Sequence, residues 1–163
     1  MKITNMKKYF LLICLFAIAL SSCRKIVDDT AFDATAQAVR DDQAIHDYFL
    51  LRGITPPIKD ASGLYYEVTN PGTGTHPTVA SNITVGYSAY SLDDVLVDSS
   101  PSAYFAPLDG LINAWRIGIP KIGKGGSITL YAPSGLAYGN AANGVNPPNT
   151  VLIFKITLQG FNN

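Results

Sequence analysis

Short runs of alternating apolar and polar residues fill the chain from about residue 60 to its C-terminal end. Clusters of Gly, Pro, Asn and Asp separate these runs, a spacing that is typical of an antiparallel β domain. In the run 82–90, Tyr87 shares a face with Val85, so Tyr87 should point toward the core. Three other runs alternate in the same way: 64–69, 128–132 and 151–158.

One further strand is expected between these runs. A hairpin turn is predicted at Asp93 and Asp94, and residues 95–97 lead out of it as a strand. Pairing should end at Pro101, because proline has no N–H group to donate to a sheet. This strand is therefore expected to be short.

The β region contains one segment with helical spacing. Asp109 can cap a helix from residue 111 to about 119. Leu111, Ile112 and Trp115 would then lie on one face of that helix. A twisted antiparallel sheet that covers one small helix accommodates all of these segments, so we expect an α+β fold.

A second helix is predicted ahead of the β domain, over residues 41–52. Asp41 and Asp42 place negative charge at its N-terminus, and Gly53 ends it. His46 lies off the apolar face and is expected to be a solvated surface residue. The packing face should consist of Ile45, Tyr48 and Phe49.

The start of the chain differs from the rest in composition. Lys7 and Lys8 precede an apolar run over residues 9–20, which is shorter than a membrane span of about 20 residues and typical of a secretory signal peptide. Residues 20–23, Leu-Ser-Ser-Cys, resemble the bacterial lipobox, in which the cysteine is acylated before the leader is removed. We expect Cys23 to carry the lipid, because two or three acyl chains hold a domain stably at a bilayer.

An ordinary signal peptide followed by an incidental thiol is the alternative to lipidation. If Cys23 is acylated, Arg24 stands where an acidic residue would be the inner-membrane retention signal of enteric bacteria. The sequence thus predicts a lipid-anchored protein of the bacterial cell envelope, at the outer membrane. The predicted parts are a signal peptide over 1–22, a tether over 23–40, a helical extension over 41–59 and the β domain over 60–163.

Charge and cysteine content exclude several classes of function. The 163 residues carry 12 basic and 12 acidic side chains. Three of the lysines lie in the signal peptide, so the remaining 141 residues have nine basic and 12 acidic groups, a net charge of −3. Nucleic acid is therefore an unsuitable partner. Both cysteines, Cys14 and Cys23, lie in or beside the leader, which leaves the β domain without a disulfide or a cysteine-based metal site.

Two catalytic motifs fail on inspection. Residues 118–125 nearly spell a phosphate-binding loop, but Gly125 replaces the Ser or Thr whose hydroxyl would hold magnesium. Glu67 is the only glutamate, which argues against a glycosidase with paired glutamates. Neither histidine lies near a suitable Ser and Asp, which argues against a hydrolytic triad.

Several sequence blocks occur in a characteristic order between residues 83 and 154. They are Val85-x-Tyr87, Val97-Asp98-Ser99-Ser100, Phe105, Leu111-Ile112-x-Ala114-Trp115, Gly118, Leu136-Ala137-Tyr138-Gly139 and Pro147-Pro148-Asn149-Thr150-Val151-Leu152-Ile153-Phe154. In order and spacing, residues 62–161 resemble the FKBP-type peptidyl-prolyl cis-trans isomerases. The resemblance implies a strongly curved antiparallel sheet of five or six strands wrapped around one short α-helix.

The resemblance also implies roles for individual residues. Asp98 and Tyr138 would be catalytic, with Tyr138 donating its hydroxyl to a substrate carbonyl and Asp98 held by a tyrosine hydroxyl at the pocket edge. Trp115 would form the floor of the pocket. The remaining substrate-binding positions would be Tyr87, Val97, Phe105, Leu111, Ile112, Val145 and Phe154. For each aromatic residue, plain core packing is the alternative role.

The implied partners are proline-containing polypeptides, with a membrane contact through the lipid on Cys23. Isomerisation of a peptide bond requires no metal, cofactor or covalent bond, and none is expected here. Macrolide inhibitors of the family become candidate ligands of the pocket by the same resemblance.

Departures from the family pattern concern activity more than fold. Val97 stands where most active members have phenylalanine, and Asn146 where isoleucine is usual, a change for which Val145 can compensate. Ala114 replaces a glycine and Lys155 an acidic residue. We therefore expect a catalytically competent enzyme with lower activity than most members of the family. A non-catalytic module that binds proline-containing or unfolded chains is the alternative, and a surface β domain for glycan or nutrient uptake is a third.

Overall fold

The computed structural model describes residues 32–162. The predicted signal peptide, Cys23 and the first part of the predicted tether lie outside the described residues. The α-helices are α2 (Ala34–Arg52) and α3 (Asn113–Gly118), and the short 3₁₀ turns are η1 (Leu108–Gly110), η2 (Ile119–Lys121) and η3 (Ser134–Leu136). The strands are β1 (Ile58–Lys59), β2 (Tyr65–Asn70), β3 (Asn82–Tyr90), β4 (Leu96–Pro107), β5 (Ser127–Ala132) and β6 (Leu152–Asn162).

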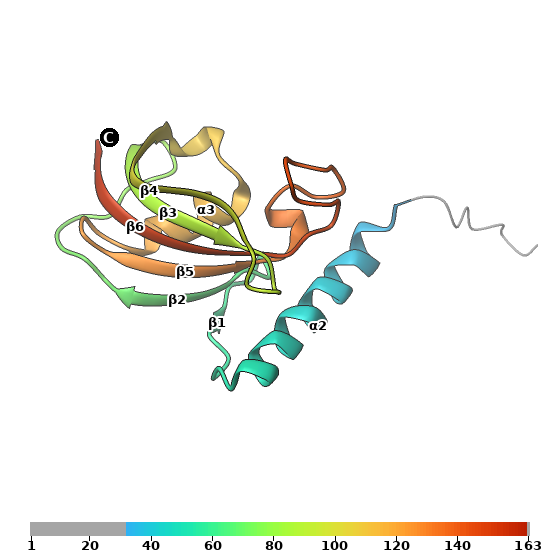
Figure 1. Ribbon diagram of the computed structural model, residues 1–163. Coiled ribbons are helices and arrows are strands. Elements are labelled where there is room, and N and C mark those ends of the chain that lie inside the picture. Colours follow the sequence, from blue (N-terminus) through green and yellow to red (C-terminus); the bar gives the residue numbers. More distant parts are fainter. Residues whose placement is uncertain (1–31, 163) are drawn as a thin grey trace, which may run out of the picture. The chain divides into compact units, whose positions relative to one another are not determined.

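The strands form one antiparallel sheet in the order β1-β2-β5-β6-β3-β4. Figure 1 shows α3 on one side of this sheet and α2 on the other. The predicted fold class, a five- or six-stranded antiparallel sheet around one short helix with an N-terminal helical extension, is confirmed.

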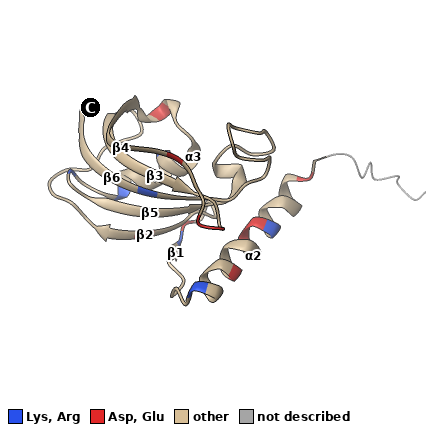
Figure 2. Ribbon diagram, viewed as in Figure 1, with Lys and Arg blue, Asp and Glu red and all other residues tan. Residues whose placement is uncertain are grey.

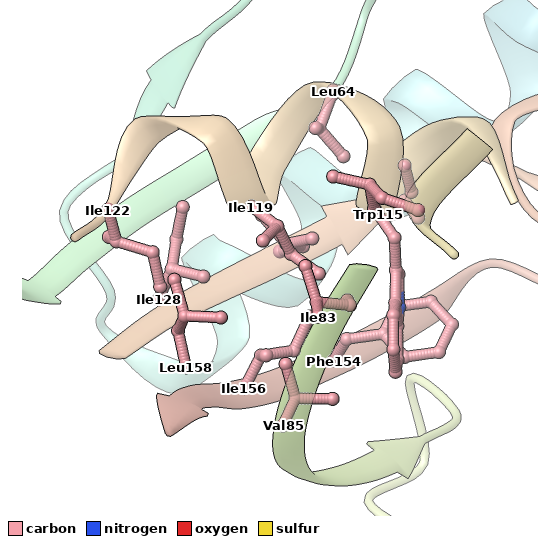
Figure 3. Close-up of a cluster of buried hydrophobic side chains, with 14 of the residues drawn as sticks. Leu64, Ile83, Val85, Trp115, Ile119, Ile122, Ile128, Phe154, Ile156 and Leu158 are labelled. Carbon is pink, nitrogen blue, oxygen red and sulfur yellow. The ribbon is translucent and has the colours of Figure 1, made fainter. Parts of the chain in front are cut away.

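Side chains that alternate along the central strands supply two separate cores. Leu130 of β5 and Phe154 of β6 pack with Trp115 on the α3 side, while the intervening Tyr131 and Ile153 face α2. Figure 3 shows the larger core, in which side chains from the α3 region lie against those of the sheet strands. The central strands are thus buried on the α3 side and, on the other face, are covered by α2 only near Tyr131 and Ile153, since Lys155 and Thr157 farther along β6 are exposed.

The N-terminal helix begins seven residues earlier than predicted, at Ala34. Asp33 is its N-cap, and Oδ1 of Asp33 accepts hydrogen bonds from the N–H groups of Thr35 (2.9 Å) and Ala36 (3.0 Å). Residues 34–40, predicted as tether, are therefore helical, and Asp41 lies inside the helix instead of at its cap. The predicted end at Gly53 is confirmed, since this residue has a left-handed φ of 63°.

The predicted packing face of α2 is confirmed: Ile45 and Phe49 are buried and Tyr48 is partly buried against the second core. The Phe49 and Tyr131 rings meet edge to face, with centroids 4.8 Å apart. His46 is exposed as expected, although Nε2 lies 2.8 Å from the hydroxyl of Tyr65. Aromatic packing between the helix and the sheet thus attaches α2.

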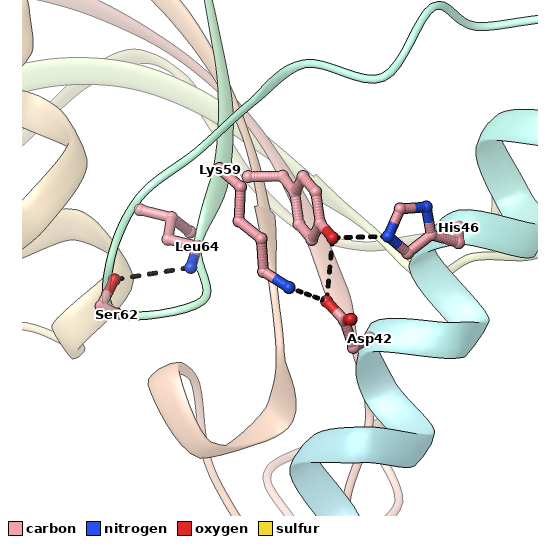
Figure 4. Close-up of polar contacts among 6 residues, drawn as sticks. Asp42, His46, Lys59, Ser62 and Leu64 are labelled. Atoms are coloured by element: carbon pink, nitrogen blue, oxygen red, sulfur yellow. Dashed lines mark hydrogen bonds and ion pairs between the residues drawn. The ribbon is translucent and has the colours of Figure 1, made fainter.

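Polar contacts add to this attachment along one side of α2. Asp42 accepts hydrogen bonds from Lys59 of β1 (2.5 Å) and from the hydroxyl of Tyr65 (2.9 Å), as Figure 4 shows for the labelled Asp42, His46 and Lys59. Partial burial opposes ionisation, but these two bonds lower the pKa of Asp42 below its ordinary value. Charged residues of both signs lie along α2, and charged residues are sparse over the sheet (Figure 2).

Strand β4 is much longer than predicted and runs through Pro101 to Pro107. It lies at the edge of the sheet and pairs only with β3 among the described strands. The register shifts between Val85 and Tyr87, whose partners are Tyr104 and Ser100, so residues 101–103 bulge out of the ladder. The prediction that Pro101 ends the pairing is wrong, because an edge strand with a bulge tolerates proline.

The short helix lies within its predicted range of 111–119 but is shorter, covering Asn113–Gly118. Asp109 lies in η1 and caps nothing, while α3 begins after Ile112 without a side-chain cap. Gly118 ends α3 beside the sheet, where a Cβ atom would lie 2.5 Å from Cδ2 of Leu130. Within residues 32–162, no helix combines the length and apolar character that crossing a membrane requires.

Candidate active site

A small pocket of about 140 Å³ opens between α3 and strands β3, β4 and β6. Each of these elements contributes at least one aromatic or charged side chain. The pocket is lined by Tyr87, Asp98, Tyr104, Leu111, Ile112, Trp115, Tyr138 and Phe154. Its walls are therefore mostly apolar, and its polar groups are two carboxylate oxygens, the phenolic hydroxyls and the indole N–H.

Trp115 forms the base of this pocket, with only 4% of its surface exposed. Its ring meets those of Tyr87, Phe154 and Tyr104 edge to face, at centroid distances of 4.9, 5.8 and 6.2 Å. Edge-to-face contacts are a favoured arrangement of aromatic rings, so the four residues support one another. Among residues 32–162, nothing accepts a hydrogen bond from the buried indole N–H of Trp115.

Asp98 is held at the mouth of the pocket by Tyr87. The Tyr87 hydroxyl donates a 2.7 Å hydrogen bond to Oδ2 of Asp98, which projects from the neighbouring strand β4. Burial raises the pKa of the Tyr87 phenol, and the hydrogen bond to Asp98 and its charge raise it further. Tyr87 consequently stays protonated and remains a donor to the carboxylate over the physiological pH range.

Tyr138 lies on the opposite side of the mouth, on the turn that follows η3. The N–H groups of its two neighbours, Ala137 and Gly139, both donate to the carbonyl of Ser134, at 2.9 and 2.8 Å. Burial raises the pKa of the Tyr138 phenol, and the charge of Asp98 raises it further. Tyr138 is 37% exposed, so its hydroxyl is a donor that a ligand in the pocket can reach.

A second cavity, of about 260 Å³, adjoins the first and shares Asp98, Tyr138 and Phe154 with it. Val97 and Val145 line this second cavity, together with Asn146. Val145 is 74% exposed, whereas Asn146 is buried and its Oδ1 has no hydrogen-bond partner within residues 32–162. The residues that the two cavities share join them into one groove, with an aromatic half and a half that is lined by Val97, Val145 and Asn146.

The groove brings together nine of the ten predicted catalytic and substrate-binding residues. Seven of them line the aromatic pocket, and Val97 and Val145 line the adjoining cavity. Phe105 is the exception: it is 65% exposed and lines neither cavity. The prediction that Phe105 forms a pocket wall is wrong, because alternate side chains of β4 point to opposite faces and Phe105 lies between the pocket-lining Tyr104 and the buried Ala106.

Tyr104 occupies the wall that Phe105 was predicted to form, and the sequence analysis missed it. Tyr104 shares a face with the buried Ala106, two residues along the same strand. The alternation over residues 104–106 would have identified Tyr104 only if β4 had been extended beyond Pro101.

Comparison with known proteins gives three findings. Residues 74–159, slightly more than half of the chain, match the model of a family described as FKBP-type peptidyl-prolyl cis-trans isomerase. The chain is 36% identical over 103 residues to the FKBP-type peptidyl-prolyl cis-trans isomerase FkpA of Escherichia coli, which covers 60% of this chain and 37% of the relative. It is 32% identical over 101 residues to the outer membrane protein MIP of Legionella longbeachae, covering 60% of this chain and 43% of the relative.

A solved structure shows the same arrangement of elements. The crystal structure of FkpA from Escherichia coli matches with a TM-score of 0.66 at 26% sequence identity, covering 99% of this chain and 74% of that one. The chain spans about two fifths of the length of the curated relatives it matches.

Proposed function

The chain belongs to the FKBP-type peptidyl-prolyl cis-trans isomerase family, and we propose that it catalyses cis-trans isomerisation of X-Pro peptide bonds in polypeptides of the cell envelope. The observation that carries the proposal is the convergence of four aromatic rings, the Asp98 carboxylate and the Tyr138 hydroxyl on one pocket. Proline is the apolar ring that such a pocket would enclose.

The reaction is a rotation and needs no chemical group transfer. The barrier of about 18–20 kcal/mol arises because resonance stabilises the planar peptide bond. Spontaneous exchange of X-Pro bonds takes tens to hundreds of seconds at 25 °C, so there is room for acceleration. A pocket that binds the twisted amide more tightly than either planar form lowers the barrier by differential binding. Exclusion of water also removes hydrogen bonds that favour the planar, charge-separated form.

Different pocket residues would exclude water from the amide and hold the substrate chain. Trp115, Tyr87 and Phe154 would enclose the proline ring and exclude water from the amide. Tyr138 would donate its hydroxyl to a carbonyl of the substrate chain and hold that chain in place. Asp98, fixed by Tyr87, would set the electric field at the amide while it twists. Macrolide inhibitors of the family would compete for the same aromatic walls.

We expect activity below that of family members with a phenylalanine at position 97. Val97 lines the adjoining cavity of about 260 Å³, where its side chain is smaller than that of phenylalanine, and this cavity shares Asp98, Tyr138 and Phe154 with the aromatic pocket. Water admitted there would weaken the desolvation on which the mechanism depends. The same adjoining cavity, with the buried Asn146 in its lining, favours the second candidate function, a peptide-binding module with little catalysis.

One pair of measurements separates the two functions. NMR exchange spectroscopy on an Ala-Pro peptide gives the rate of isomerisation, and a titration of Trp115 fluorescence with the same peptide reports binding. We expect an exchange rate well above that in buffer together with saturable binding. A rate equal to that in buffer would reject the enzyme, and saturable binding at that rate would establish the binding module.

Anchoring at the envelope is part of the proposal and rests on the sequence around Cys23 and on the relative named as an outer membrane protein. Expression of the full chain in a Gram-negative bacterium tests it. We expect the protein to partition into detergent and to gain the mass of a diacylglyceryl group after loss of residues 1–22. The Cys23→Ser variant should remain in the aqueous phase. Equal partitioning of the two proteins would contradict lipidation.

A further inference from the structure

Asp41 is a buried carboxylate on the face of α2 that packs against the domain. It lies four and eight residues before Ile45 and Phe49, so the three side chains follow one stripe along the helix. All three are buried, and Asp41 is 3% exposed. An apolar residue at position 41 would continue the stripe at lower cost, because burying a carboxylate requires compensating hydrogen bonds.

The compensation comes from the loop before the Tyr138 turn. Oδ2 of Asp41 accepts hydrogen bonds from the N–H group (2.8 Å) and the hydroxyl (2.6 Å) of Ser134, which is itself 1% exposed. Oδ1 accepts a third bond, from the side chain of Gln37 at 2.6 Å. Within residues 32–162, no Lys or Arg forms an ion pair with Asp41, so these neutral donors hold the carboxylate.

Ser134 connects this carboxylate to the candidate active site. Its N–H and hydroxyl are held by Asp41, and its carbonyl accepts the N–H groups of Ala137 and Gly139 on either side of Tyr138. The carbonyl of Gly139 in turn accepts the N–H group of Asn149 at 2.8 Å, shortly before β6 begins. The donors of Ser134 thus bind α2, and its carbonyl binds the turn that carries Tyr138, so Ser134 links the two.

We propose that Asp41 is a positioning residue, which fixes the hydroxyl of Tyr138 over the pocket by holding Ser134. The proposal rests on the proposed isomerase function. Hydrogen bonds to an ionised carboxylate are shorter and stronger than those between neutral groups, so Asp41 gives Ser134 a firmer anchor than a neutral residue could. An error of about 1 Å in the position of a substrate-holding group is enough to reduce a rate substantially.

Attachment of the helix alone does not account for Asp41. Ile45, Phe49 and the aromatic residues of the second core already dock α2, and Asp42 adds its bonds to Tyr65 and Lys59. Asp41 makes none of these contacts, and within residues 32–162 its hydrogen bonds to the domain go only to Ser134. The hydrogen bonds of Asp41 to the domain therefore stabilise the turn that carries Tyr138.

The test compares Asp41→Ala, Asp41→Asn and Asp42→Asn in the full chain. Asp42→Asn is the matched control, because it makes the same change one residue along and the carboxylate of Asp42 binds Tyr65 and Lys59 instead of Ser134. Two readouts are used: the isomerisation rate on the Ala-Pro peptide and the hydrogen-exchange rates of the Ala137 and Gly139 amides. Exchange at the Leu130 and Phe154 amides reports whether the sheet is intact.

We expect Asp41→Ala to lower kcat/KM about fivefold, the effect of misaligning one hydrogen bond to substrate. The Ala137 and Gly139 amides should exchange about tenfold faster or more, with Leu130 and Phe154 unchanged. Asp41→Asn retains an acceptor oxygen and should lie between Asp41→Ala and the wild type. Asp42→Asn should match the wild type in both readouts and in peptide affinity measured by Trp115 fluorescence.

Wild-type protection of Ala137 and Gly139 in Asp41→Ala would overturn the proposal, as would an equal loss of rate in Asp42→Asn. A wild-type protein without isomerase activity would instead reject the proposed function and the catalytic consequence of Asp41. In that case the amide exchange rates would still decide whether Asp41 holds the Tyr138 turn, so the two failures are distinguishable.

Discussion

The hydroxyl of Tyr87 donates a 2.7 Å hydrogen bond to Oδ2 of Asp98 across the β3–β4 pair. The donor belongs to the aromatic wall of the pocket, and the acceptor is the carboxylate at its mouth. A single bond thus fixes both the plane of one wall and the position of the charge. Orientation of a charge before the reaction is the condition under which electrostatics accelerates it.

Tyr87→Phe should keep the wall and release the carboxylate. We expect the isomerisation rate to fall about fivefold and the free energy of unfolding to fall by about 1 kcal/mol, because one hydrogen bond is lost. Chemical denaturation and NMR exchange on one peptide give both values. Tyr90→Phe, the same change three residues along β3 and outside the pocket, is the control and should keep the wild-type rate.

Trp115 provides a spectroscopic test of the pocket. As the only tryptophan, and 4% exposed, it should emit at a blue-shifted wavelength and resist quenching by iodide or acrylamide. A prolyl peptide should change its intensity on binding. Emission at the wavelength of free tryptophan, with full quenching, would favour an exposed aromatic platform of the kind expected for glycan uptake.

Gly118 tests the close approach of α3 to the sheet. In Gly118→Ala the new methyl group would lie 2.5 Å from Cδ2 of the fully buried Leu130, which has little room to move. We expect a loss of about 1–3 kcal/mol in the free energy of unfolding, measured by urea denaturation. Gly160→Ala is the matched control, because nothing lies within 4 Å of its added Cβ. Equal stability of the two variants would contradict the packing described for α3.

The ion pair between Asp60 and Lys121 predicts a specific acid sensitivity. The N–H group of Ser62 and the Lys121 ammonium, 3.0 Å away, lower the pKa of Asp60 to about 2. The unfolded value is about 3.9, so this stabilisation is complete above about pH 4 and is lost as the pH falls toward 2. Asp60→Asn should remove that part of the pH dependence of the unfolding free energy.

The control for this titration is Asp109→Asn, since Asp109 forms no ion pair within residues 32–162. Its unfolding free energy should follow the wild-type curve between pH 2 and 4. If Asp60→Asn and wild type lose stability in parallel over that range, the Asp60 pair does not contribute as described.

Alternation and residue order were sufficient to predict the sheet, the packing face of α2 and most of the pocket. Tyr87 and Trp115 could be placed because their positions depend on local periodicity and on motif order. The start of α2 was missed because residues 34–40 contain few large apolar groups, and only the Asp33 cap indicated the helix. Local capping chemistry was the stronger signal there.

The errors at β4 and at Asp41 have a different cause. Whether Pro101 breaks a strand depends on its place at a sheet edge, which a single sequence does not specify. The bulge adds two residues to β4 and so leaves the alternation of side chains unchanged, which puts Tyr104, and not Phe105, on the same face as Asp98. Asp41 was interpreted as a capping charge, because its partner Ser134 lies 93 residues away in the chain. Contacts of that range become visible only in the folded chain.

We propose that this pocket accelerates rotation about X-Pro bonds through Asp98 and the aromatic walls. The most direct test measures cis-trans exchange of one Ala-Pro peptide by NMR with wild-type protein and with Asp98→Ala at equal concentrations. We predict exchange well above the rate in buffer for the wild type, and a rate enhancement about tenfold smaller for a folded Asp98→Ala variant. Wild-type exchange equal to that in buffer, or equal enhancement by both proteins, would contradict the claim.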